Sequence, residues 1–141
     1  MTPDAKIDTD AVMHVAAFRA ALRSFLRESE VVARACGLTP QRYLLLLMIK
    51  GAPDGSERAT VTELVDRLGV AQSTVTELVR RAEEVGLIER EPSQHDGRVT
   101  YLRVTREGER RLLHSFTRHE IERQRLREAF AELDRDTQTP R

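Results

Sequence analysis

Apolar residues recur every three to four positions near both ends of the chain, the spacing of one face of an α-helix. Residues 10–36 predict a long helix whose apolar face contains Val15, Phe18, Leu22, Phe25 and Val32. Residues 106–135 predict a second long helix, with a face formed by Leu112, Phe116, His119, Arg123, Leu126, Phe130 and Leu133. A chain of 141 residues is too small to cover both faces, so we expect a symmetric dimer. The expected interface contains Val15, Leu22, Phe116, His119, Leu126, Phe130 and Leu133.

The segment between these helices has shorter patterns. Thr39-Pro40 predicts a helix start, and residues 43–49 are apolar on all sides, which predicts a buried helix. Residues 51–59 predict a loop. Thr60 and Glu63 have the spacing of a capping box, and Val61, Leu64, Val65 and Leu68 form a stripe that ends at Gly69. A short amphipathic helix is therefore predicted over residues 61–68.

A second amphipathic helix follows directly, with a stripe of Val75, Leu78, Val79 and Ala82 that ends at Gly86. Residues 87–91 and 99–105 alternate in the manner of strands, with a polar turn at 92–97. The order helix, turn, helix, hairpin is typical of a winged helix-turn-helix, which lays its second helix in the DNA major groove. The predicted fold is mainly α with a small two-stranded β-wing. It forms one domain over residues 1–141, with a winged helix-turn-helix lobe at 39–105 and dimerisation helices at 10–36 and 106–135.

The exposed face of the second short helix, opposite its apolar stripe, carries side chains that can bind base edges. Gln can bind adenine through two hydrogen bonds, Glu can accept from cytosine N4, and Thr can contact a thymine methyl. The alternative is an ordinary solvated face. For Arg98 the alternative to minor-groove contact is an ion pair with Asp96, and for His95 it is a solvated loop. The predicted DNA-binding residues are Gln72, Ser73, Thr74, Thr76, Glu77, Arg80, Arg81, His95 and Arg98.

Charge limits this interpretation. The chain has no net charge, and residues 60–105 contain six Arg and eight acidic residues, 6 − 8 = −2. A nonspecific nucleic-acid binder would be basic. The basic charge must therefore be focused on one face by Arg80, Arg81 and Arg98, and we expect specific binding with modest nonspecific affinity.

The rest of the composition argues against several classes of protein. No apolar run is long enough for a membrane span and the N-terminus lacks a signal-peptide core, so a cytoplasmic protein is expected. A single cysteine, Cys36, excludes an internal disulfide, and its alternatives are a redox sensor or a small residue at a helix end. No metal or cofactor site is expected. No nucleophile–base pair or phosphate loop appears, so we do not expect an enzyme.

Four pieces of the chain together resemble the MarR family of bacterial transcriptional regulators. They are GLTPQRYLLLLMI, TVTELVDRLGVAQSTVTELVRRAEEVGLIERE, the wing DGR and VTREG, within residues 10–130. The resemblance implies a dimer that binds palindromic double-stranded operators. The chain departs from the family in having Ala71 at the helix N-cap, Asp96-Gly97-Arg98 in the wing and Ala82 late in the helix.

The same resemblance implies a small-molecule pocket between the dimer helices and the winged lobe, which would take a small aromatic or apolar acid. Its expected lining is Phe18, Leu22, Tyr43 and Leu47, with Arg19 or Arg42 as the carboxylate partner. The alternative is that these residues fill the core. The function predicted is a homodimeric repressor relieved by such a ligand, and the alternative is a winged-helix protein-interaction module without DNA binding.

Overall fold

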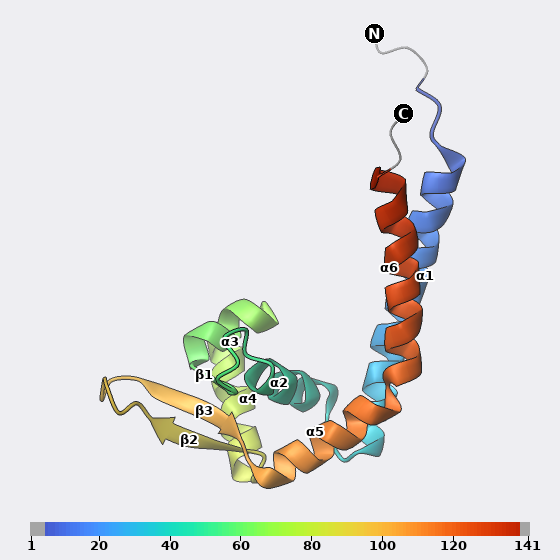
Figure 1. The fold of residues 1–141 in the computed structure, drawn as a ribbon. Coiled ribbons are helices and arrows are strands. Elements are labelled where there is room, and N and C mark those ends of the chain that lie inside the picture. The colour runs from blue at the N-terminus through green and yellow to red at the C-terminus, as the bar shows by residue number, and fades with distance from the viewer. Residues whose placement is uncertain (1–4, 139–141) are drawn as a thin grey trace.

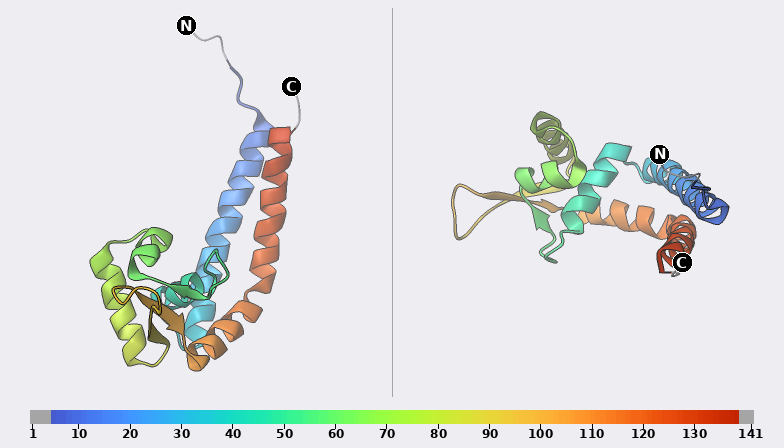
Figure 2. Two further views of the ribbon diagram at one scale, coloured as in Figure 1. Left: turned by 60° about the vertical axis from the view of Figure 1, so that its left-hand side comes forward. Right: turned by 90° about the horizontal axis from the view of Figure 1, so that it is seen from above.

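The structure, a computed structural model, describes residues 5–138 and contains a winged lobe joined to a two-helix arm (Figure 1). The predicted domain, 1–141, extends beyond the described residues at both ends. Helices α1 (Thr9–Ala35) and α6 (Glu120–Gln138) lie side by side in all views and form the arm (Figure 2). They are antiparallel, because Phe18 contacts Phe130 with ring centroids 6.3 Å apart while Phe25 lies against His119. Within residues 5–138, no helix has the length and apolar character needed to cross a membrane.

Helix α2 (Pro40–Lys50) is the centre of the lobe. Thr39 caps its first turn by accepting a hydrogen bond from the backbone N–H of Arg42 at 3.2 Å, and Pro40 occupies the first helical position. Tyr43, Leu45, Leu46 and Ile49 are buried. The prediction of a helix buried on most sides is confirmed.

Helices α3 (Val61–Leu68) and α4 (Gln72–Glu84) form the helix-turn-helix. Both hydrogen bonds of the predicted capping box are present between Thr60 and Glu63. Gly69 ends α3 in the left-handed conformation, at φ 66°, which a residue with a side chain would adopt only under strain. Ala71 is the N-cap of α4 and provides no side-chain hydrogen bond there.

The sheet has three antiparallel strands, β1 (Arg58–Ala59), β2 (Ile88–Pro92) and β3 (Thr100–Val104), in the order β1-β3-β2. The mainly α winged fold is confirmed, but the wing is not limited to two strands. Arg58 pairs with Arg103 and Ala59 with Leu102, so the end of the expected loop 51–59 is a strand. Two residues are too few to show alternation in the sequence, and the pairing with β3 defines this strand.

The single helix predicted over residues 106–135 is wrong. The structure divides it into α5 (Arg106–Arg118) and α6, which meet at an angle at His119 (Figure 1). The imidazole Nε2 of His119 donates to the carbonyl of Phe25 at 3.0 Å, and its ring lies 4.4 Å from the Phe25 ring. Arg123 Nη1 donates to the carbonyl of Phe116 at 2.6 Å, which satisfies the end of α5. These contacts break the helix at His119, although the spacing of apolar residues continues through it.

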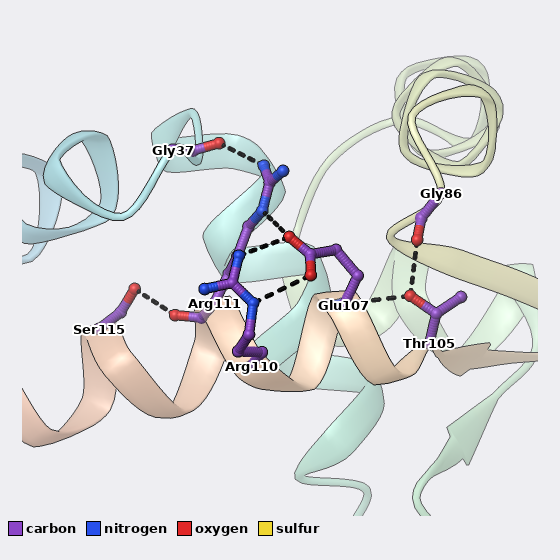
Figure 3. Close-up of polar contacts among 8 residues, drawn as sticks. Gly37, Gly86, Thr105, Glu107, Arg110, Arg111 and Ser115 are labelled. Carbon is purple, nitrogen blue, oxygen red and sulfur yellow. Dashed lines mark hydrogen bonds and ion pairs between the residues drawn. The ribbon is translucent and has the colours of Figure 1, made fainter.

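Helix α5 joins the arm to the lobe through polar contacts at its first turns (Figure 3). Thr105 caps α5 and its hydroxyl donates to the carbonyl of Gly86 at 2.6 Å, directly after α4. Arg111 Nη1 donates to the carbonyl of Gly37 at 2.9 Å, at the turn between α1 and α2. Gly108 fits here because it has no side chain: a Cβ would lie 2.4 Å from the carbonyl oxygen of Leu87. Helix α5 is therefore fixed against the segment that follows α4.

Candidate nucleic-acid interface

Helix α4 has one buried face and one exposed face. Val75, Val79 and Ala82 are at most 1 % exposed and belong to the core of the lobe. The opposite face presents side chains to solvent, and the predicted DNA-binding residues exposed on it are Gln72, Ser73, Thr74, Thr76, Arg80 and Arg81. The periodicity therefore placed these six residues on the correct side of the helix.

Ion pairs occupy the C-terminal half of that face. Glu77 Oε1 lies 2.6 Å from Arg80 Nη2 and 2.8 Å from Arg81 Nε, and its Oε2 lies 2.9 Å from Arg80 Nε. The hydrogen bonds from Arg80 and then Arg81 lower the pKa of the Glu77 carboxyl to about 2. Arg80 also pairs with Glu84. The spacing of Glu77 before two arginines at i+3 and i+4 is legible in the sequence and is the signal for these pairs.

The same pairing recurs across the winged lobe. Arg67 pairs with Glu63 at 2.7 Å, Arg90 with Glu83 at 3.1 Å and Arg103 with Glu91 at 3.4 Å. With Arg80 and Arg81, these are five of the six arginines in residues 60–105. Within residues 5–138, no ion pair engages the guanidinium of the sixth, Arg98.

Arg98 lies in the loop between β2 and β3, which projects from the lobe on the side away from the arm (Figure 1). Asp96 shapes this loop by accepting a hydrogen bond from the backbone N–H of Arg98 at 3.0 Å, and not by pairing with its guanidinium. The hydroxyl oxygen of Ser93 accepts from the backbone N–H groups of His95 and Asp96, each at 3.2 Å. His95 and the Arg98 side chain are exposed on a loop that the side chains of Ser93 and Asp96 hold in place.

One basic residue at the root of the wing was not predicted from the sequence. Arg58 lies on β1, and its guanidinium carbon is 3.9 Å from the centroid of the Tyr101 ring on β3. This cation–π contact joins the short strand to the hairpin. Residues 51–59 were predicted to form a loop, and no local pattern there indicates that Arg58 lies beside the wing.

Comparisons with known proteins agree with this architecture. A MarR family model matches residues 37–99, which include α2, α3, α4 and β2. The transcriptional regulator Tm0710 from Thermotoga maritima is 33% identical, over 72% of this chain and 69% of that one, with a TM-score of 0.60. The chain belongs to the MarR family.

Other solved structures share the fold at lower identity. YusO from Bacillus subtilis is 24% identical, over 84% of this chain and 82% of that one, with a TM-score of 0.60. A mutant of E. coli MarR complexed with operator DNA is 18% identical, over 86% and 85%, with a TM-score of 0.63. No curated protein matches the chain.

The structure does not bring the predicted ligand-binding residues into one cavity. Phe18 faces Phe130 between α1 and α6, while Arg19 and Leu22 line a shallow hollow on α1. Tyr43 is a core residue, and Arg42 lies one position before it at the start of α2. A cleft of about 380 Å³ lies between α2 and α5, and Leu47 is the one predicted ligand-binding residue that lines it.

That cleft is apolar with one charged pair at its edge. Leu112, Leu113 and Phe116 of α5 face Leu47 across it. Lys50, also at the cleft, lies 2.6 Å from Glu109 and 2.9 Å from Glu57. Hydrogen bonds to Glu109 first and Glu57 second raise the pKa of the Lys50 ammonium, so this group stays charged.

The residues predicted for a dimer interface differ in exposure and form three sets. Val15, Phe116 and Phe130 are 48%, 44% and 61% exposed, large values for apolar side chains. Leu22 of α1 and Leu126 and Leu133 of α6 are half-buried. His119 is only 1% exposed, because its ring is enclosed at the α5–α6 junction. Contrary to the expectation from the apolar seam, it lies inside the protomer.

Proposed function

We propose that this MarR-family protein is a sequence-specific regulator that binds double-stranded operator DNA as a homodimer and represses transcription until a small molecule binds. The observation that carries the proposal is the free polar surface at the N-terminal end of α4, flanked by a wing with an unpaired arginine. In a helix-turn-helix, the N-terminal residues of the second helix contact base edges.

The side chains on this part of α4 have the chemistry for base readout. Gln72 can bind adenine through two hydrogen bonds, Thr76 can contact a thymine methyl, and Ser73 can bond to either partner of a pair. Within the described part of the chain no hydrogen bond engages these three side chains, so they are available to DNA. We assign Thr74 and His95 to nearby phosphates and Arg98 to the minor groove or its phosphates.

Dimerisation follows from the exposed apolar residues of the arm and of α5. Val15, Phe116 and Phe130 would leave water when a second copy packs against them, and each fully buried side chain of this size stabilises an interface by about 1.5–3 kcal/mol. A two-fold dimer would present two α4 helices about 34 Å apart, one turn of DNA. An operator with inverted half-sites is the matching target. The E. coli MarR mutant has been solved on operator DNA, and an S. aureus MepR mutant has been solved bound to an oligodeoxyribonucleotide.

The ligand step is proposed at the cleft between α2 and α5, in place of the scattered residues expected from the sequence. An apolar acid would bury its ring against Leu112 and Phe116 and place its carboxylate at Lys50, in competition with Glu109. The cleft lies between the lobe and the helix that connects it to the arm. A ligand there releases DNA only if it favours a dimer whose α4 helices no longer match the half-site spacing.

The experiment that tests DNA recognition is selection from a random duplex library, followed by titration of the enriched sequence. Gln72→Ala and Thr76→Ala should each weaken binding to that sequence by about 1–3 kcal/mol and relax the preference at one base pair. Gln124→Ala, at an exposed position on α6, is the matched control and should change neither. If no sequence is enriched, the protein-interaction alternative replaces this proposal.

A further inference from the structure

Glu77 holds the two arginines of α4 that are best placed to reach phosphates. Its carboxylate accepts two hydrogen bonds from Arg80, at 2.6 and 2.9 Å, and one from Arg81, at 2.8 Å. Glu77 is the only carboxylate partner of Arg81 among the described residues, whereas Arg80 also has Glu84. Arg81 is therefore the arginine that Glu77 alone controls.

A carboxylate and a phosphate compete for the same guanidinium geometry. Both present two oxygens that accept parallel N–H donors, and Arg binds either group through two hydrogen bonds. While Glu77 occupies the Nε edge of Arg80 and of Arg81, a phosphate can reach these edges only by displacing it. Glu77 is thus an internal competitor of DNA.

The position of Arg80 and Arg81 on α4 places them where DNA phosphates are expected. Gln72 and Arg80 are eight residues apart, about 12 Å along the helix axis. The major groove is about 12 Å wide, so a helix whose first turn reaches the base edges has Arg80 and Arg81 near the groove margin, where phosphates lie.

We propose that Glu77 lowers the affinity for DNA of any sequence by keeping Arg80 and Arg81 from phosphates, so that tight binding requires the added base contacts of an operator. This inference rests on the proposed DNA-binding function. Nonspecific binding consists almost entirely of phosphate contacts, so the pairing weakens it directly. Operator binding also draws on Gln72, Ser73 and Thr76, which do not depend on these arginines. The assignment replaces the expectation that Glu77 accepts from cytosine N4.

The test compares Glu77→Gln with Glu107→Gln on a random-sequence duplex of about 30 base pairs, three helical turns. Glu107 is a matched control, because it pairs with Arg110 and Arg111 at the same i+3 and i+4 spacing on α5. Both substitutions change the net charge equally. A double variant, Glu77→Gln with Glu84→Gln, frees Arg80 as well.

Glu77→Gln should steepen the dependence of log K on log salt by about 0.9 per half-site, the value of one added phosphate contact. Each added contact also makes binding fall by a further factor of about 3.5 between 50 and 200 mM salt. The double variant should steepen the slope further, and Glu107→Gln should leave it unchanged. The gain of Glu77→Gln should disappear when Arg81→Gln is added.

Two slope measurements would overturn the inference. They are an unchanged slope in Glu77→Gln and an equal increase of the slope in Glu107→Gln. If Glu77→Gln loses its preference at a single base pair, Glu77 contacts a base and the inference is wrong. The random-duplex measurements need no operator, so they test Glu77 even if selection enriches no sequence and the proposed function fails.

Discussion

Gly108→Ala tests how α5 is fixed to the lobe. The added Cβ would lie 2.4 Å from the carbonyl oxygen of Leu87 and 2.7 Å from Val104 Cγ1. The carbonyl is backbone and cannot rotate away, and it already accepts a hydrogen bond from the backbone N–H of Thr105 at 3.0 Å. Either α5 or the segment directly after α4 must therefore move by several tenths of an ångström or more.

Two effects oppose each other in this variant. Overpacking a well-packed site costs about 1–3 kcal/mol, and a clash with backbone belongs at the upper end of that range. Ala favours a helix over Gly by about 1 kcal/mol. The net loss in the free energy of unfolding is then about 2 kcal/mol, which corresponds to a Tm lower by about 6–8 °C for a domain of this size.

Urea denaturation followed by circular dichroism measures this loss. Gly97→Ala is the control, because no atom lies within 4 Å of its Cβ position and its φ is not in the left-handed region. It should leave stability unchanged or raise it by up to about 1 kcal/mol. A Gly108→Ala protein as stable as the wild type would refute the reasoning that α5 is held against Leu87.

Three further predictions concern local contacts. Ala71→Ser should supply the missing cap of α4 and stabilise the protein by about 0.5–2 kcal/mol, and an unchanged urea midpoint would contradict this. Arg98→Ala should lower the salt slope by about 0.9 per half-site on every duplex, and a wild-type slope would show that its guanidinium contacts no phosphate. The hydrogen bond that His14 Nδ1 donates to the Asp136 carboxylate raises the pKa of His14 above its ordinary value of 6.5, so this contact between the ends of α1 and α6 is complete below pH 6.5 and is lost as pH rises through the raised pKa. An NMR titration should therefore place the His14 midpoint higher in the wild type than in Asp136→Asn, and equal midpoints would exclude the contact.

The features predicted correctly from the sequence are those that local chemistry determines. The capping box of Thr60 and Glu63 and the turn at Gly69 depend on residues at most a few positions apart. The exposed face of α4 follows from the spacing of Val75 and Val79, because a helix with a buried stripe must present its other side to water.

The features that were missed depend on residues far apart in the chain. The break at His119 requires the carbonyl of Phe25, 94 residues away, and the spacing of apolar residues is the same on both sides of it. Gly108 reads only as a helix residue until the carbonyl of Leu87 is placed beside it. The lining of the cleft between α2 and α5 could not be predicted, since spacing along α1 and α2 does not determine which faces enclose a space.

The most direct test of the central claim is the affinity and stoichiometry of the wild-type protein on the sequence selected from random duplexes, measured beside a scrambled duplex of equal length. We expect an inverted repeat with half-sites about 10 base pairs apart, two chains per duplex, and binding at least about 1,000-fold tighter than to the scrambled duplex. Equal affinity for the two duplexes, or a single chain bound per duplex, would contradict recognition of an operator by a dimer through α4 and the wing.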